Sequence, residues 1–251
     1  MKKSVNALST RKMMIVGLLG SVSIVLGAIP GLGFIPVGPT RATIMHIPVI
    51  IGAIMEGPLV GGLIGLIFGL FSIFQAATNP TPVSFVFLNP IVSVLPRVLI
   101  GIVTYYAYRF SKNLGSKKSM GLLNIIWIFM LFYLFYGLYA EISDFTSIWS
   151  ILINILLIIL TITIVVYANK KMKDKAVDII ISTALGTLTN TVGVLSTIYF
   201  IYGEQYVEKL GQSAEMARKI ILGIGVANGI PEIIIGIIVV TNVVVALNRK
   251  K

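Results

Sequence analysis

Long apolar stretches alternate with short polar segments along the whole chain. A helix that crosses a membrane needs about 20 apolar residues, because the hydrocarbon core is about 30 Å thick. Residues 43–55 are shorter, which predicts a half-length or tilted helix that joins the next one through Glu56-Gly57-Pro58. The longer stretches are 13–29, 59–78, 86–108, 120–139, 148–168, 176–202 and 220–247. The pattern predicts an all-α integral membrane protein of about eight spans.

Basic residues gather at every second junction between these stretches. Cytoplasmic loops are enriched in Lys and Arg, so both ends of the chain are predicted to lie on the cytoplasmic side. The short stretch 43–55 must count as a crossing, since otherwise the later junctions would change sides. The residues on this side are 15 of the 20 Lys and Arg, namely Lys2, Lys3, Arg11, Lys12, Arg109, Lys112, Lys117, Lys118, Lys170, Lys171, Lys173, Lys175, Arg249, Lys250 and Lys251.

The composition excludes an ordinary water-soluble domain. Hydrophobic residues make up 57% of the chain and charged residues 12%, with a mean hydropathy of +0.97, whereas soluble domains carry about 25% charged residues. The net charge of +11 does not indicate nucleic-acid binding, because the basic residues flank apolar stretches instead of forming one patch. The chain has no Cys and one His, which excludes disulfides and argues against a metal site.

Two loops predicted on the outer side are rich in proline and yet apolar. Ile29–Thr43 contains three Pro and three Gly, and Ala77–Pro90 also contains three Pro, so neither can be helical throughout. Irregular backbone at membrane depth must lie in protein or face water. These loops therefore predict a lid over an outer cavity, although turns that dip into the lipid headgroups fit the same pattern. The third outer loop, Gly203–Arg218, is polar and is predicted to be an ordinary exposed loop.

Two charged residues fall inside apolar stretches. A charge at the centre of a spanning helix costs about 2.5–3.5 kcal/mol on insertion scales, so each one needs a physical reason. Arg97 lies about eleven residues into its stretch and Glu232 about twelve into its own, which places both at a similar depth. They either form an ion pair that fixes the packing of the helices or face a bound substrate, and the two arrangements are compatible.

Neutral polar residues surround these charges. Residues 186–191 (Gly-Thr-Leu-Thr-Asn-Thr) place a polar cluster inside an apolar helix, and Asn228 lies four residues before Glu232 on one helical face. Pro231 frees a backbone carbonyl near that face. The candidate substrate-binding residues are His46, Asn89, Arg97, Asn190, Asn228, Glu232 and Arg41. For His46 the alternative is a ring satisfied by neighbouring groups.

Small residues form stripes on two of the predicted helices. Such residues permit close contact between helices, either within the chain or with another protein. On the stretch 59–78, Gly62, Gly65 and Gly69 favour packing inside the chain. On the first stretch, the candidate partner-docking residues are Gly17, Gly20, Ser21, Ser23 and Gly27.

The sequence contains no motif of an enzyme. The P-loop pattern, HExxH and GxSxG are absent, and the nine acidic residues form no cluster along the sequence. ATP-driven transport by this chain alone is therefore excluded, and no catalytic residue and no metal ligand is predicted.

A series of short motifs adds to this pattern. They are Met45–Ala53 (MHIPVIIGA), the turn 56–58, Gly61–Gly69 (GGLIGLIFG), Pro96-Arg97, Leu188–Thr191 (LTNT) and Asn228–Glu232 (NGIPE). In this order they resemble the substrate-binding S components of energy-coupling factor (ECF) vitamin transporters, and the last two look most like the pantothenate-type members. The resemblance covers residues 10–110 and 176–248.

The resemblance implies a six-helix bundle that captures a vitamin from outside, beneath a mobile first loop. It implies docking of the first helix onto a transmembrane coupling subunit driven by two cytoplasmic ATPase subunits. ATP is then used by those partners, and this chain binds no cofactor of its own. The alanine-spaced motif usual on the first helix is replaced here by residues 17–27.

One part of the chain goes beyond a six-helix bundle. Residues 119–170 are predicted to form an inserted transmembrane hairpin, which lies between basic segments and so leaves the sidedness of the rest unchanged. Its apolar and aromatic faces favour a position at the lipid-facing periphery. The predicted organisation is a cytoplasmic basic N-terminus (1–12), the first four bundle helices (13–118), the hairpin (119–170), and the last two bundle helices with a basic C-terminus (171–251).

The resemblance puts pantothenate first among substrates and pyridoxine-like compounds next. Pantothenate is an anion with hydroxyl and amide groups, so Arg97 or Arg41 is expected to meet its carboxylate and Asn89, Asn190 and Asn228 the rest. An unpaired Glu232 that faces the ligand would instead favour a neutral or cationic substrate. The alternatives from another class are a secondary transporter acting alone, which often shows two related halves, and a membrane enzyme.

Overall fold

The computed structural model describes residues 9–29, 31–37, 40–143, 148–171 and 174–248. These residues form α-helices, two 3₁₀ helices (η) and one pair of short strands. In chain order the elements are α1 (Thr10–Ala28), β1 (Phe34–Val37), β2 (Thr40–Thr43), α2 (Ile47–Glu56), α3 (Pro58–Thr78), η1 (Ser84–Leu88), α4 (Pro90–Ser93), α5 (Leu95–Leu114), α6 (Ser116–Ser143), α7 (Ile148–Lys171), α8 (Asp174–Lys209), η2 (Ala214–Met216) and α9 (Ala217–Asn248).

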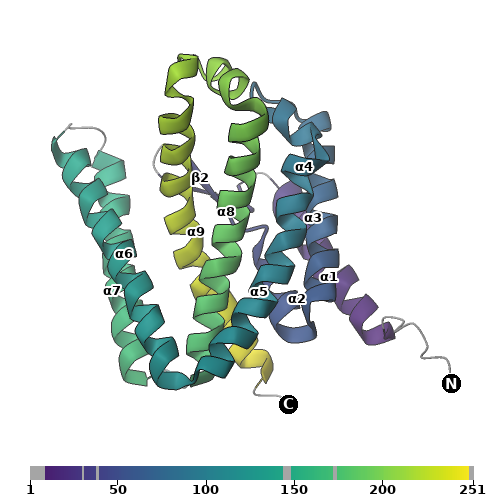
Figure 1. Cartoon of the computed structure of the whole chain (residues 1–251), viewed down its shortest axis with the longest axis vertical. Helices are drawn as coiled ribbons and strands as arrows, with labels where there is room; N and C mark the ends of the chain where they lie inside the picture. The colour runs from purple at the N-terminus through teal and green to yellow at the C-terminus, as the bar shows by residue number, and fades with distance from the viewer. Residues whose placement is uncertain (1–8, 30, 38–39, 144–147, 172–173, 249–251) are drawn as a thin grey trace.

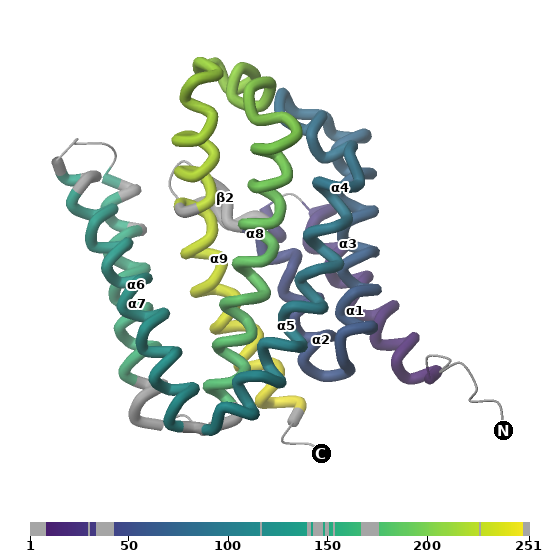
Figure 2. Tube along the Cα trace, in the orientation of Figure 1, coloured from purple at the N-terminus to yellow at the C-terminus, as the bar shows by residue number. Residues whose placement is uncertain are grey.

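The helices run up and down in one bundle (Figures 1 and 2). Helices α8 and α9 pack along each other and are joined at the top, and α3, α5 and α2 complete the centre. Helix α1 begins, and α9 ends, at the bottom of the view. Each predicted span has a helical counterpart, and the all-α membrane class is confirmed, with the small β-hairpin as an addition.

Six helical segments of the described residues are long and apolar enough to cross a membrane. They are Thr10–Ala28, Pro58–Thr78, Pro90–Leu114, Lys117–Tyr139, Ala176–Lys209 and Ala214–Leu247. The shorter apolar helices are Ile47–Glu56 and Asn154–Val166. The count of eight spans and the cytoplasmic position of both ends stay predictions.

Close packing of α3 against α5 depends on glycine, as the stripe on α3 predicts. A Cβ on Gly65 would collide with the backbone carbonyl of Arg97, and a Cβ on Gly101 would collide with the backbone of Gly61. Only residues without a side chain allow two helix backbones to approach so closely. This contact fixes the position of the backbone that carries Arg97.

The first outer loop is more regular than the sequence suggested. Strands β1 and β2 pair antiparallel, with Phe34 opposite Thr43 and Val37 opposite Thr40. Figure 1 shows β2 at the level of the middle of α9, and the two elements are in contact. The segment is therefore a hairpin that reaches down beside the bundle, and the expectation of irregular backbone was wrong for residues 34–37 and 40–43.

The other two outer loops also differ from the prediction. The fourth span was expected to begin at residue 86, but residues 84–88 are a 3₁₀ turn and α4 begins at Pro90. Gly203–Arg218 was expected to be an exposed loop, but α8 continues to Lys209 and α9 begins at Ala217. Tyr206 and Val207 are buried against Ile221, so apolar packing extends the helix beyond its last long apolar run.

Helices α6 and α7 form a hairpin at the left edge of the bundle in Figure 1, away from α1 at the right. The inner face of α6 has the spacing i, i+4, i+7, i+11, and its residues Leu123, Trp127, Met130 and Leu134 are buried with residues of α8 and α9. On the other side of α6, Phe129 and Phe132 are exposed. This arrangement agrees with a peripheral hairpin; the domain boundaries proposed from the sequence stay predictions.

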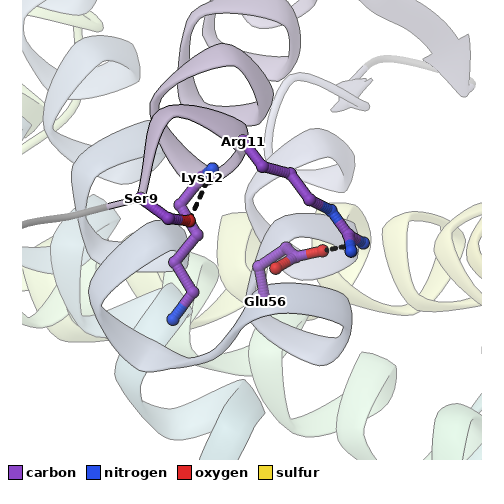
Figure 3. Close-up of polar contacts among 4 residues, drawn as sticks. All are labelled: Ser9, Arg11, Lys12 and Glu56. Carbon is purple, nitrogen blue, oxygen red and sulfur yellow. Dashed lines mark hydrogen bonds and ion pairs between the residues drawn. The ribbon is translucent and has the colours of Figure 1, made fainter.

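The lower end of α1 is tied to the end of α2 (Figure 3). Ser9 caps α1 by accepting a hydrogen bond from the Lys12 N–H, and Arg11 forms an ion pair with Glu56 at 2.8 Å. Glu56 ends α2, and the turn into α3 follows at Gly57, whose φ of +103° favours glycine. The pair holds α1 beside the turn that reverses the chain.

Candidate ligand-binding site

A cavity of about 460 Å³ lies among α3, α5, α8, α9 and the segments that precede α2 and α4. Pockets for small molecules span about 300–1,000 Å³, so this volume fits one such ligand. On α3 the lining follows one helical face, with Phe68, Phe71, Ser72 and Gln75, and Asn79 continues it just beyond the end of the helix. The cavity therefore has aromatic as well as polar walls.

Arg97 enters the cavity because of the proline before it. Pro96 has no N–H, so the carbonyl of Val92, four residues earlier, lacks its helical partner. The Arg97 Nη1 group donates a hydrogen bond to this carbonyl. The helix break also separates α4 from α5 at Val94. The arginine side chain thus satisfies the backbone group that its neighbouring proline leaves free.

The rest of the guanidinium remains available. It lies 5.4 Å from the centre of the Phe68 ring and 5.6 Å from that of Phe87, which are cation–π distances. The side chain is 6% exposed, and Nε has no hydrogen-bond partner. A guanidinium carries five N–H donors, so Arg97 can still bind an anion with two of them.

Glu232 is held by the chain itself. Its Oε1 accepts a hydrogen bond of 2.8 Å from the backbone N–H of Thr43, and its Oε2 accepts one of 2.9 Å from the Thr191 hydroxyl. Within the part of the chain that the structure describes, the ion pair Arg11–Glu56 is the one found within 4.0 Å. Arg97 and Glu232 therefore line the same cavity but do not form the ion pair that the sequence allowed.

Asn190 and Asn228 present unsatisfied polar atoms. Both residues line the cavity, Asn190 from α8 and Asn228 from α9. In each, the buried Oδ1 has no hydrogen-bond partner. An amide oxygen without a donor costs free energy in a buried position, so each site favours a ligand that supplies an N–H or O–H group. The structure thus brings together Arg97, Asn190, Asn228 and Glu232 of the predicted set.

His46 and Asn89 of the predicted set are not among the residues that line the cavity. His46 is fully buried beside the N-terminus of α2, with its Nε2 3.0 Å from the Thr187 hydroxyl, and it does not line the cavity. Asn89 caps α4 and donates to the Tyr202 hydroxyl at 3.1 Å. Arg41 belongs to β2, but its side chain lies outside the described part of the structure. Contact of these three residues with substrate stays a prediction.

Several cavity residues were absent from the predicted set. Thr43 acts through its backbone, which no residue type signals. Thr191 belonged to the recognised polar cluster, and its place beside Glu232 follows from the packing of α8 on α9. Phe68 and Phe87 looked like any apolar residues of a span or loop, and only the position of Arg97 distinguishes them.

The small residues of α1 divide between two faces. Gly20, Ser23 and Gly27 are buried within the chain, where Ser23 donates to the Met45 carbonyl at 3.1 Å. Gly17 and Ser21 are exposed, and a Cβ on Gly17 would meet no atom within 4 Å. The exposed pair is the part of the predicted docking set that is free to meet a partner.

No three His, Cys or acidic side chains gather into a possible metal site within the described residues. That the chain binds no metal or cofactor stays a prediction.

Comparison with known proteins gives two kinds of match. The family model for "ECF transporter, substrate-specific component" matches residues 11–149 and 138–244. The pantothenic acid transporter PanT of Lactococcus lactis subsp. cremoris (strain MG1363) is 35% identical over an alignment of 89 residues. This alignment covers 30% of this chain and 45% of that protein. The pantothenate transporter PanT of Leuconostoc mesenteroides subsp. mesenteroides is 35% identical over 102 residues, 38% of this chain and 50% of that protein. The chain spans about half the length of these curated relatives.

Proposed function

The chain belongs to the family of substrate-specific components of ECF transporters, and from this premise we propose that it binds pantothenate and delivers it for uptake. It is a multi-pass protein of the cell membrane and a component of a transporter, not an enzyme. The names of its two partial relatives support pantothenate.

The choice of substrate rests on one observation. Within one cavity, Arg97 has N–H groups without partners, and the side-chain oxygens of Asn190 and Asn228 have no donors. Arg97 would receive the carboxylate of the ligand, since an Arg–carboxylate pair is strong and directional. Asn190 and Asn228 would pair with its hydroxyl and amide groups. Both oxygens of Glu232 already accept bonds from the chain, so Glu232 does not need a donor from the ligand.

The same observation separates pantothenate from the pyridoxine-like alternative. Pyridoxine has no carboxylate, so it would leave Arg97 buried beside Phe68 and Phe87 without an anion. Leaving a buried charge unpaired is costly.

The proposed partners are a transmembrane coupling subunit and two cytoplasmic ATPase subunits that use ATP. The family supports this assembly, and the absence of a P-loop from the sequence agrees with hydrolysis by other subunits. The proposed docking face of α1 contains Gly17 and Ser21, between exposed apolar residues such as Leu18 and Val22.

The test compares pantothenate with pantothenol, in which an alcohol replaces the carboxylate, by thermal shift and titration of the purified protein. Pantothenate is expected to raise the melting temperature and to bind far more tightly than pantothenol. Arg97→Met should abolish this preference with little change in the melting temperature of the unliganded protein. The absence of stabilisation by pantothenate, or an unchanged preference in Arg97→Met, would overturn the proposal.

The alternative of a transporter that acts alone is tested separately. The chain reconstituted by itself in vesicles is expected to bind pantothenate and not to accumulate it. Accumulation driven by an ion gradient without partner subunits would favour a secondary transporter.

A further inference from the structure

We infer that Glu232 is a positioning residue that holds the β1–β2 hairpin against the cavity through the Thr43 N–H and thereby sets how long a ligand stays bound. The inference rests on the proposed function, because it concerns the exchange of the same ligand. It assigns Glu232 to the hairpin, whereas the sequence made it a candidate ligand contact.

The geometry of the hairpin directs this one N–H group toward α9. Thr43 is the last residue of β2 and lies opposite Phe34. The next residue, Ile44, donates its N–H to the Gly33 carbonyl and so closes the hairpin. Successive N–H groups of a strand point to opposite sides. The Thr43 N–H therefore points away from β1, and it donates to Glu232.

This bond is a specific anchor for an element that has few others. A two-stranded hairpin is marginally stable by itself in water. Of the hydrogen bonds formed by described groups, Thr43–Glu232 is the one that joins a hairpin strand to a helix. Its acceptor is a carboxyl oxygen of a side chain that is only 4% exposed, and a hydrogen bond is stronger in such an environment than in water.

The carboxylate is itself held in place. The Thr191 hydroxyl donates to Oε2, which leaves Oε1 directed at Thr43. Thr43 and Met45 line the cavity beside Glu232. Release of the Thr43 N–H would therefore loosen the wall of the cavity at Thr43, without removing Arg97, Asn190 or Asn228 from the ligand.

Matched substitutions at Thr43 isolate the backbone bond. Thr43→Pro removes the N–H at a position where it is not used between the strands, and the residue before a proline favours the extended backbone that β2 already has. Thr43→Val removes the hydroxyl, which accepts a long hydrogen bond of 3.4 Å from the Met45 N–H, but keeps the Thr43 N–H, and its branched side chain suits a strand. Glu232→Gln keeps a neutral acceptor, and Glu232→Ala removes it.

The first measurement is pantothenate exchange by the purified full chain. Glu232→Ala and Thr43→Pro are each expected to raise the dissociation rate constant about ten-fold, the factor that corresponds to loss of one charge-assisted hydrogen bond. The association rate constant should change little. The double variant should be no faster than either single variant, since both remove the same bond. Glu232→Gln should be intermediate, and Thr43→Val should match the unsubstituted protein.

A second measurement needs no ligand. Hydrogen exchange of the peptide that contains residues 40–46 should be faster in Glu232→Ala and Thr43→Pro than in Thr43→Val. If pantothenate does not bind to the unsubstituted protein, the proposed function fails and hydrogen exchange still tests the anchor. Exchange of this peptide unchanged in Glu232→Ala overturns the anchor. The anchor is also overturned if pantothenate dissociates slowly from Thr43→Pro while Glu232→Ala no longer binds it. That result would make Glu232 a ligand contact.

Discussion

At the scale of single residues, the missing N–H of Pro96 accounts for the position of the Arg97 guanidinium in the cavity. Pro96 removes a helical donor, the Val92 carbonyl is left free, and Arg97 satisfies it from the next position. The guanidinium is thereby oriented between Phe68 and Phe87 before any ligand arrives. Such preorganisation lowers the cost of ordering the side chain when an anion binds.

We predict that Pro96→Ala weakens pantothenate binding several-fold without lowering thermal stability. Alanine restores an N–H to the Val92 carbonyl, so Arg97 loses its internal partner and its fixed orientation. Titration calorimetry and a melting curve measure the two effects. Pro90→Ala is the control, because Pro90 is at the first position of α4 and breaks no internal helical bond. Equal affinity in both variants would contradict this account of Arg97.

At the scale of elements, the contact of α3 with α5 carries the cavity wall. Gly65 lies against the Arg97 carbonyl, and Phe68, one turn later, lies beside the guanidinium. Packing of two backbones at this distance makes the geometry of the site depend on a residue that has no side chain.

The prediction for this contact is a comparison of two glycines that lie three residues apart on α3. Gly65→Ala should lower the free energy of unfolding by about 1–3 kcal/mol, because the methyl group meets backbone that cannot rotate away. Gly62→Ala should be nearly neutral, since its Cβ would lie 3.8 Å from Val98. Denaturation midpoints of the two variants in the same detergent check the difference. Equal midpoints would show that the helices are not held at this distance.

The elements also show where sequence reasoning succeeds. Span length and apolar content locate α1, α3, α8 and α9, because burial of about 20 residues in lipid leaves a signal within the sequence itself. The β-hairpin gave no such signal, since its Pro and Gly residues suggested irregular backbone and its pairing is set by contact with α9.

For the site, the sequence indicated which residue types matter, but it did not indicate which of them contact each other. Arg97 and Glu232 were recognisable because charges are rare inside spans, and Asn190 and Asn228 because they are amides near those charges. The sequence did not show that Glu232 bonds Thr43 and Thr191 in place of Arg97. That choice depends on how four separate segments meet in space.

At the scale of the whole molecule, the cavity and the α6–α7 hairpin are separate. None of the described residues that line the cavity comes from α6 or α7. The hairpin packs against α8 and α9, and Trp127, which is 1% exposed, belongs to the apolar cluster that joins them. The two parts of the molecule should therefore respond independently to substitution.

We predict that Trp127→Ala lowers stability by about 3–5 kcal/mol, the usual cost of removing a buried Trp side chain, and leaves the dissociation constant for pantothenate unchanged. Phe129→Ala, on the same helix but 71% exposed, should change neither quantity. Melting curves and titration of both variants in lipid nanodiscs provide the measurement. A large loss of affinity in Trp127→Ala would show that the hairpin supports the site after all.

The order of residues along the sequence decides which contacts of the two buried charges are available during synthesis. Arg97 contacts Phe68, Phe87 and the Val92 carbonyl, all of which precede it in the sequence. Glu232 likewise accepts from Thr43 and Thr191, which both precede it. When the ribosome adds Glu232, these partners have already been made. The residues of α8 and α9 that line the cavity beside Arg97, such as Asn190 and Asn228, are made after it. Arg97 therefore reaches its enclosed position only once α8 and α9 have been inserted, whereas the contacts of Glu232 are complete as α9 inserts.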